Sequence, residues 1–177
     1  MQVPDTKVAE IIDGELVVSP RPASLHAHAS SVLGMDVGGP FHRDPDDPAG
    51  PGGWWILDEP ELHLQDDVLV PDLAGWRRER LPILAQAPFF ELSPDWVCEV
   101  VSPSTARVDR TRKMRIYARD GVERVWLVDP LAHTLEVYRL DAGRWILASV
   151  HGGDEVVHAE PFDAVALRLD RWWLPDA

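Results

Sequence analysis

Residues 96–129, WVCEVVSPSTARVDRTRKMRIYARDGVERVWLVD, decide the fold of this chain. Trp96 to Val101 is nearly continuous in apolar residues, which predicts a central strand covered on both faces. A helix is expected from about Thr105 to Arg119, and Val125 to Val128 follows as a second strand. Strand, helix and strand within about 35 residues predict a βαβ unit, in which two parallel strands are joined by a right-handed crossover.

The ends of the central helix and two β-hairpins are marked by turn residues. Ser104 is the predicted cap of the helix and Gly121 closes it. The Asp13-Gly14 pair lies between β-prone runs in Val8 to Val18 and predicts an N-terminal hairpin with a primed turn. A C-terminal hairpin is expected from Thr134 to Val150, with its turn at Asp141-Ala142-Gly143.

The region between the N-terminal hairpin and the central unit predicts one helix, a loop and two strands. Ser24 can cap a helix that runs to about Val37 and ends at Gly38-Gly39-Pro40. Residues 39–53 are rich in Pro, Gly and Asp and predict a flexible loop. Trp54 to Leu64 and Asp67 to Trp76 are each expected to form a strand. The predicted fold class is α/β (α+β), with a mixed central sheet flanked by helices and one domain over residues 1–177.

Composition and charge limit the possible functions. The 177 residues are 45% hydrophobic and 27% charged, as in a soluble globular domain. No stretch is long and apolar enough to span a bilayer, and the start MQVPDTK lacks the features of a signal peptide, so we expect a cytoplasmic protein. The net charge of −13 weighs against tight, non-specific binding of a polyanion.

Two carboxylates stand where strands should be apolar. Glu99 shares a predicted strand face with Val97 and Val101, and Asp72 lies in the predicted strand ending at Trp76. An unpaired buried carboxylate costs several kcal/mol, so each of these acids needs a cation or strong hydrogen-bond donors. One cation could satisfy both if the two strands are neighbours.

Lys113 is the natural third member of this group. Asp109, Lys113 and Tyr117 recur every four residues along one side of the central helix. Two acids that hold Mg²⁺ and a lysine that orients water or offsets charge form a recurring arrangement for phosphodiester hydrolysis. The residues alone leave an ordinary interpretation open, with Asp72 as a turn acid, Glu99 paired with an arginine, and Lys113 in a helix ion pair with Asp109.

Other candidate residues carry weaker signals. His26 and His28 are spaced so that they point to different sides of a helix, which favours capping or core roles over shared metal binding. Glu10 and Glu15 are most simply solvent-facing. Cys98 alternates away from Glu99 and is expected to be a buried, inert thiol. The sequence contains no phosphate-binding loop, serine-hydrolase elbow or HExxH zinc motif.

Three segments carry a resemblance to a known family. AEIIDGELVVSP with His26, VLVPDLAGW, and residues 94–140 resemble the Uma-two family of restriction-endonuclease-like proteins, of the PD-(D/E)XK nuclease superfamily. The resemblance extends from about Val8 to Leu140. It implies a mixed sheet flanked by helices and an endonuclease that depends on Mg²⁺ or Mn²⁺ and acts on DNA.

The resemblance also implies roles for individual residues. Asp72 would be the acid of the PD element and Glu99 that of the (D/E)XK element, both of them metal ligands. The position two after Glu99 is Val101, so the lysine role would pass to Lys113, 113 − 99 = 14 residues later. A further acid would fall to Glu10 or Glu15, with His26 as another candidate to complete the site.

Charge and the displaced lysine keep a second hypothesis open. Basic residues cluster at positions 107–119 and 77–80, where a local positive patch could receive a phosphate and bind DNA weakly. The leading hypothesis is a catalytic endonuclease using Asp72, Glu99 and Lys113. The alternative is a catalytically weak or inactive nuclease-fold protein that acts as a dimeric interaction module, and in either case a homodimer is expected.

Overall fold

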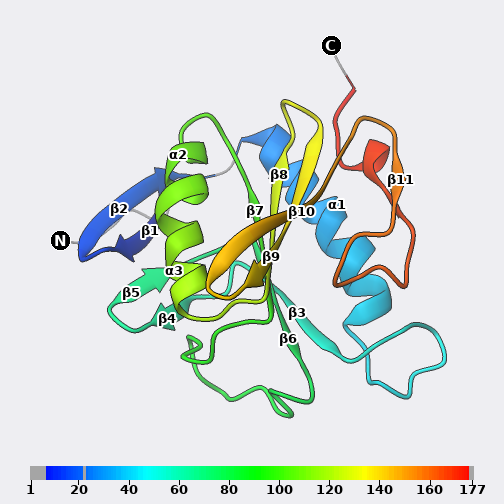
Figure 1. Ribbon diagram of the computed structural model, residues 1–177, viewed down its shortest axis with the longest axis horizontal. Coiled ribbons are helices and arrows are strands. Elements are labelled where there is room, and N and C mark those ends of the chain that lie inside the picture. Colours follow the sequence, from blue (N-terminus) through cyan, green and yellow to red (C-terminus); the bar gives the residue numbers. More distant parts are fainter. Residues whose placement is uncertain (1–6, 22, 176–177) are drawn as a thin grey trace.

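The computed structural model describes residues 7–21 and 23–175, and the N-terminal residues on which the signal-peptide expectation rests lie outside this part. Its largest sheet has six strands in the order β10-β9-β8-β7-β6-β3 (Figure 1). The bounds of these strands are β3 Trp54–Asp58, β6 Leu73–Arg77, β7 Trp96–Val100, β8 Arg124–Asp129, β9 Thr134–Asp141 and β10 Arg144–Gly152.

This central sheet is mixed, as the sequence predicts. Strands β7 and β8 pair in parallel, whereas the other neighbouring pairs in the sheet are antiparallel. All five residues of β7 are buried, in agreement with the prediction of a strand covered on both faces. The C-terminal hairpin also forms, and Ala142 and Gly143 both have positive φ in its turn.

The crossover between β7 and β8 is helical over the predicted span but is not one regular helix. It consists of α2 Ala106–Val108, a π-helical segment η1 Asp109–Lys113, and α3 Met114–Arg119. The prediction of Ser104 as the cap is wrong, because Thr105 is the N-cap and no side-chain cap bond forms among the described residues. The Ser104 hydroxyl instead lies 2.9 Å from that of Ser102.

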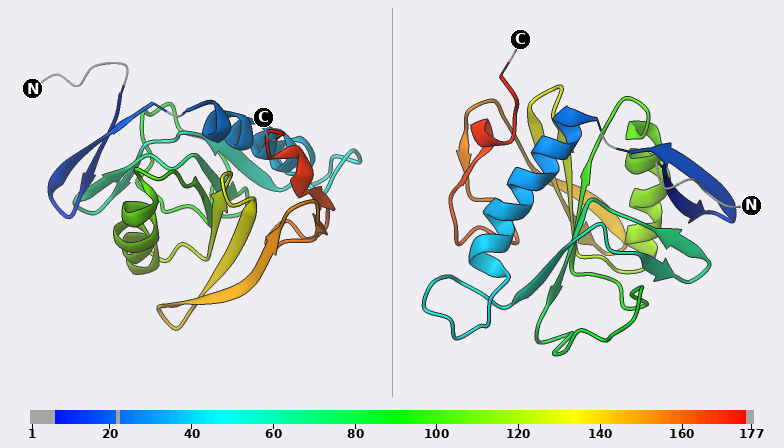
Figure 2. Two further views of the ribbon diagram at one scale, coloured as in Figure 1. Left: turned by 90° about the horizontal axis from the view of Figure 1, so that it is seen from above. Right: turned by 180° about the vertical axis from the view of Figure 1, so that it is seen from behind.

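Helices cover the two faces of the central sheet (Figure 2). On one face α1, Ser24–Phe41, packs with the C-terminal segment around Trp96, Trp126 and Phe162. On the other face α3 packs against Val97 and neighbouring strand residues. The C-terminal segment holds the short elements β11 Val156–Val157, β12 Leu167–Arg168 and η2 Leu169–Arg171.

The predicted strands 54–64 and 67–76 are wrong as continuous strands, because each breaks in the middle. Four strands form instead, and the two pieces nearest the connecting turn, β4 Leu62–Leu64 and β5 Asp67–Leu69, leave the central sheet. Glu59 has positive φ, and its amide donates to the carbonyl of Asp72 at 3.0 Å. Pro60 and Pro71 lack backbone donors, so the ladder is interrupted on both strands at the same level. Asp72 therefore lies in a bend just before β6.

The N-terminal hairpin forms as predicted and joins the displaced strands. It consists of β1 Lys7–Ile12 and β2 Glu15–Pro20, and Asp13 and Gly14 both have positive φ in the turn. The second sheet has the order β2-β1-β5-β4. The hairpin thereby lies beside the crossover helix at one end of the central sheet (Figure 1).

Helix α1 is longer than predicted. Gly38-Gly39-Pro40 does not end it, since the helix continues to Phe41 with Pro40 inside its last turn, and the cap is Ala23. Phe41 is buried and its ring packs against Phe162 at 4.7 Å, so tertiary packing outweighs the local tendency to stop. The remainder of the predicted loop, residues 42–53, contains no helix or strand.

Candidate active site

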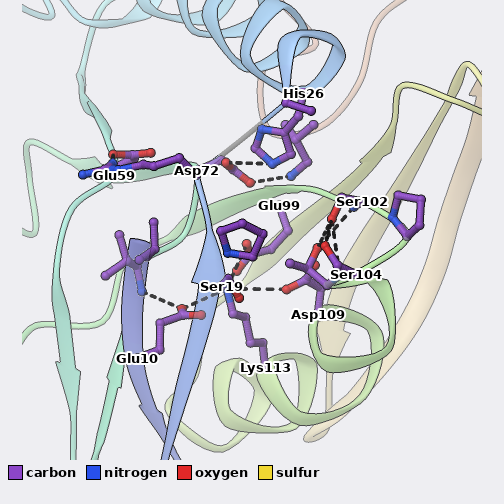
Figure 3. A pocket seen from close by; sticks show the side chains of 18 residues that line it. Glu10, Ser19, His26, Glu59, Asp72, Glu99, Ser102, Ser104, Asp109 and Lys113 are labelled. Carbon is purple, nitrogen blue, oxygen red and sulfur yellow. Dashed lines mark hydrogen bonds and ion pairs between the residues drawn. The ribbon is translucent and has the colours of Figure 1, made fainter. Parts of the chain in front are cut away.

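Three buried carboxylates surround the ammonium group of Lys113 (Figure 3). Its Nζ lies 2.9 Å from Glu10 Oε1, 3.2 Å from Glu99 Oε2 and 3.5 Å from Asp109 Oδ1. These acids come from β1, β7 and η1. The hairpin, the central sheet and the crossover helix thus meet at one lysine.

The π-helical segment places Lys113 and Asp109 together. Both residues lie in η1 and are buried, with side-chain exposures of 5% and 4%. Tyr117, one turn further along in α3, is fully buried and donates its hydroxyl hydrogen bond to Glu99 Oε1. The prediction that Asp109, Lys113 and Tyr117 share one side of the helix is confirmed. Wide helical turns of this kind are often found at functional sites.

Burial and charge shift the pKa values of this cluster in definite directions. Burial raises the pKa of Glu99 well above its usual range, and Lys113 opposes this shift without cancelling it. Burial also raises the pKa of Asp109. Burial disfavours the charged form of Lys113, but Glu99, Glu10 and Asp109 outweigh that effect and raise its pKa well above the usual value. Lys113 is therefore favoured as a cation, whereas Glu99 and Asp109 both have a raised pKa.

Asp72 is held from two directions. Its Oδ2 accepts a hydrogen bond from the backbone amide of Val100 at 2.7 Å. Its Oδ1 lies 3.2 Å from Nε2 of His26, which is on the first turn of α1. Burial works against a charged His26 ring, but Asp72 outweighs it and raises the His26 pKa.

The predicted residues Asp72, Glu99 and Lys113 line one cavity of about 310 Å³. Glu10, His26 and Asp109 border the same space. Hydroxyl-bearing residues complete its walls, namely Ser19, Ser102, Ser104 and Thr105. A second cavity, of about 510 Å³, runs beside α1 and shares Asp72, His26 and Glu59 with the first. The two cavities therefore meet at Asp72.

The structure distinguishes between the alternatives that the sequence leaves open for the further acid. Glu10 is 5% exposed and belongs to the cluster, so the expectation that it faces solvent is wrong. Its carboxylate also accepts the Val70 amide at 2.9 Å. Glu15, whose side chain is 72% exposed, pairs instead with Arg112 at 3.0 Å. Period-two alternation cannot reveal this difference, because it depends on what packs over the hairpin.

Two further assignments concern His28 and Cys98. His28 points away from the cavity and lies near the carbonyl oxygen of Arg171, so the two histidines of α1 do not act together. Cys98 is fully buried on the opposite face of β7 from Glu99, as predicted. Sequence reasoning missed the contact between His26 and Asp72, for which no local signal exists, since it joins residues 46 positions apart (72 − 26).

Most of the arginines in the two basic clusters are paired with acids, which reduces the positive charge that these clusters present. Arg112 and Arg115 both pair with Asp13 at 2.8 Å. The other ion pairs of these clusters join Arg78 to Asp44, Arg80 to Asp95, Arg110 to Glu136, and Arg119 to Asp67 and Asp120. Of the clustered basic residues, Lys113 borders the first cavity.

The donor set fits a hard divalent cation, although residues 7–21 and 23–175 contain no ready-made group of three metal-binding side chains. Mg²⁺ is usually held by one or two carboxylates together with water and substrate phosphates. Asp72 and Glu99 supply carboxylates in that number at one cavity. The three acids around Lys113 carry three negative charges against one positive charge when ionised, an excess of two.

Comparisons with known proteins agree with this fold. Residues 1–170 match the family model of Uma2, the Uma-two family, described as "Putative restriction endonuclease". The chain is also similar to the crystal structure of a protein from Anabaena variabilis ATCC 29413, described as a putative nuclease belonging to DUF820. The TM-score is 0.76 and the identity 22%, over 96% of this chain and 93% of that one. At this identity the likeness concerns the fold.

No curated protein matches the chain. In the described part of the chain, none of the helices has the length and apolar character needed to cross a membrane.

Proposed function

This chain belongs to the Uma2 family, and we propose that it is a divalent-metal-dependent nuclease of the PD-(D/E)XK type that hydrolyses phosphodiester bonds in DNA. Asp72 and Glu99 are the proposed metal ligands for Mg²⁺ or Mn²⁺. Lys113 is the proposed catalytic lysine, supplied by the crossover helix.

The observation that carries the proposal is the charge imbalance of the buried cluster. Glu10, Glu99 and Asp109 all contact one ammonium group. Charged groups this deeply buried need compensation, because water cannot solvate them fully. Without a metal ion, protonation can relieve this excess, because burial raises the pKa of Glu99 and of Asp109. A divalent cation beside Glu99 would take the place of those protons, and Asp72 lies on the same cavity to share it.

The roles of the chain's own residues follow from their contacts. Asp72 and Glu99 would hold the cation, which supplies Lewis acidity toward the phosphoryl oxygens. The neighbouring acids raise the pKa of Lys113, which favours its protonated form over a role as general base. Its ammonium can instead orient the attacking water by donating a hydrogen bond, and it can offset negative charge that develops on the phosphorus centre.

The shape of the site supports a polymeric substrate. Asp72 and His26 line both cavities, so the space on which Asp72 lies extends beyond the first cavity, along α1. A strand that is cut internally needs room on both sides of the bond that breaks. The ion pairs of most clustered arginines and the net charge of −13 predict that DNA binding is weak without a divalent ion.

The test is a cleavage assay on supercoiled plasmid and on single-stranded DNA, with Mg²⁺, with Mn²⁺ and with EDTA. We expect cleavage in the presence of either metal ion and a loss of at least about 100-fold in Asp72→Ala and Glu99→Ala, since each change removes a ligand. Glu15→Ala is the matched control for loss of an acid and should retain activity. Cleavage that persists in Asp72→Ala, or in EDTA, would contradict the proposal.

A further inference from the structure

We propose that His26 is a positioning residue that fixes the carboxylate of Asp72 for divalent-cation binding. The inference rests on the proposed function, because it assigns a role to His26 through a proposed metal ligand. It explains why a histidine stands at the start of α1 with its ring turned into the cavity wall (Figure 3).

The first argument is the geometry around Asp72. His26 Nε2 lies 3.2 Å from Oδ1, within the range of an N–H···O hydrogen bond, while the Val100 amide donates to Oδ2. The two donors come from α1 and β7, on different sides of the carboxylate. A carboxylate held at both oxygens by rigid elements keeps one orientation.

The second argument is the environment of the His26 ring. The side chains of His26 and Asp72 are only 13% and 14% exposed. The other ring nitrogen, Nδ1, is buried and has no hydrogen-bond partner within residues 7–21 and 23–175. Of the groups that favour the charged ring, Asp72 has the largest effect, ahead of the Val100 backbone and Asp109.

The third argument is the comparison with His28 on the same helix. His28 Nε2 lies 3.1 Å from the carbonyl oxygen of Arg171, far along the chain from the acid cluster. It provides a histidine of the same helix that makes a side-chain contact unrelated to the cavity. An effect that is seen with His26 and not with His28 therefore does not arise from the helix as a whole.

The expected consequence is a change in metal affinity. Hydrogen-bond partners of metal ligands typically contribute 10- to 100-fold to affinity or activity. Without the Nε2 donor, Asp72 keeps only the Val100 bond and can rotate Oδ1 away from the position it needs. We therefore expect His26→Met, which fills similar space without a donor, to weaken Mn²⁺ binding about tenfold.

The experiment measures Mn²⁺ affinity by electron paramagnetic resonance titration in the absence of nucleic acid. His26→Gln retains an N–H donor at a similar reach, and should bind Mn²⁺ within about threefold of wild type. His28→Met is the control and should bind like wild type. Thermal unfolding in EDTA checks that each variant is folded. The Gln and Met variants at position 26 are similar in size and differ in whether they carry an N–H donor.

A double-mutant cycle separates positioning from a general effect on the fold. In an Asp72→Ala background, His26→Met should cause no further loss of Mn²⁺ affinity, because the group that His26 positions is gone. An undiminished loss in that background would overturn the inference.

The other possible outcomes of the Mn²⁺ titrations also test the inference. Wild-type affinity in His26→Met, or an equal loss in His26→Gln and His26→Met, overturns the role of the Nε2 donor and leaves the proposed nuclease function standing. A wild-type protein that binds no Mn²⁺ at millimolar concentration overturns the proposed function and this inference together.

Discussion

The carboxylate of Asp72 accepts a hydrogen bond of 2.7 Å from the backbone amide of Val100. Val100 directly follows Glu99, so this bond ties one proposed metal ligand to the strand that carries the other. The neighbouring strands β6 and β7 bring the two positions together. The spacing of the two acids is therefore set by the sheet as well as by their side chains.

Removing the ammonium group of Lys113 from the buried cluster should destabilise the protein strongly. Lys113→Met leaves Glu10, Glu99 and Asp109 without their shared partner. Loss of one partner of a buried ion pair typically lowers the free energy of unfolding by about 3–5 kcal/mol. Urea denaturation in EDTA at neutral pH measures this change.

The control for Lys113→Met is Arg115→Met in α3, since the Arg115 side chain is 66% exposed and pairs with Asp13. An exposed pair contributes about 0–1 kcal/mol, so this variant should unfold nearly like wild type. Equal stabilities of the two variants would contradict the central role that we assign to Lys113.

Glu99→Gln should change the pH dependence of stability. The pKa of Glu99 is raised on folding from the ordinary value of 4.5, so the native state binds more protons than the unfolded state above that pH. The Glu99 contribution to the free energy of unfolding must then fall as the pH rises from about 4.5 through the raised pKa. In EDTA the stability of Glu99→Gln relative to wild type should therefore grow with pH.

Denaturation curves collected from pH 4.5 to pH 8 test this expectation. Addition of Mg²⁺ should stabilise wild type and have little effect on Glu99→Gln, because a ligand that binds only the native state raises its stability. Parallel pH profiles for the two proteins would show that Glu99 is not perturbed in the way described.

The two tyrosines of the chain offer a matched pair. Tyr117→Phe removes the hydroxyl that donates to the buried Glu99, and should lower the free energy of unfolding by about 1–3 kcal/mol, the range for a buried polar group that loses its partner. Tyr138→Phe removes a donor to the less buried Glu136 and should have a smaller effect. Chemical denaturation measures the free energy of unfolding of both variants. A larger loss in Tyr138→Phe than in Tyr117→Phe would contradict this prediction.

Substitutions of Glu10 and of Glu15 should differ in their effects on Mn²⁺ affinity and cleavage rate. Glu10→Gln alters an acid that contacts Lys113, and we expect about a tenfold reduction in Mn²⁺ affinity or cleavage rate. Glu15→Gln alters an exposed acid paired with Arg112 and should leave both quantities unchanged. Isothermal titration with Mn²⁺ and the plasmid assay provide the two readouts, and equal effects of the two changes would contradict the assignment.

The sequence predicts the sheet core of this protein well, because its signals are local. An apolar run gives β7, and the Asp13-Gly14 turn gives the N-terminal hairpin. The four-residue spacing of Asp109, Lys113 and Tyr117 correctly places them on one side of the crossover helix.

Other features depend on packing between distant segments and have no local signal. Alternation cannot show that β1 turns Glu10 toward Lys113, or that α1 brings His26 to Asp72. The end of α1 was predicted from Gly38-Gly39-Pro40, but the burial of Phe41 extends the helix. The family resemblance is confirmed, whereas the homodimer stays a prediction that analytical ultracentrifugation can test.

The π-helical turn that carries Asp109 and Lys113 has a consequence for chain length. Each residue of an ordinary helix advances the direction of the side chains by about 100°, so one residue inserted or deleted in the helical part of the crossover before Lys113, from Ala106 onward, would turn the ammonium group away from the cluster. A chain that keeps this site should therefore accept changes of residue type in the segment more readily than changes in its length. The interval of 113 − 99 = 14 positions indicates where to look for the displaced lysine in other sequences.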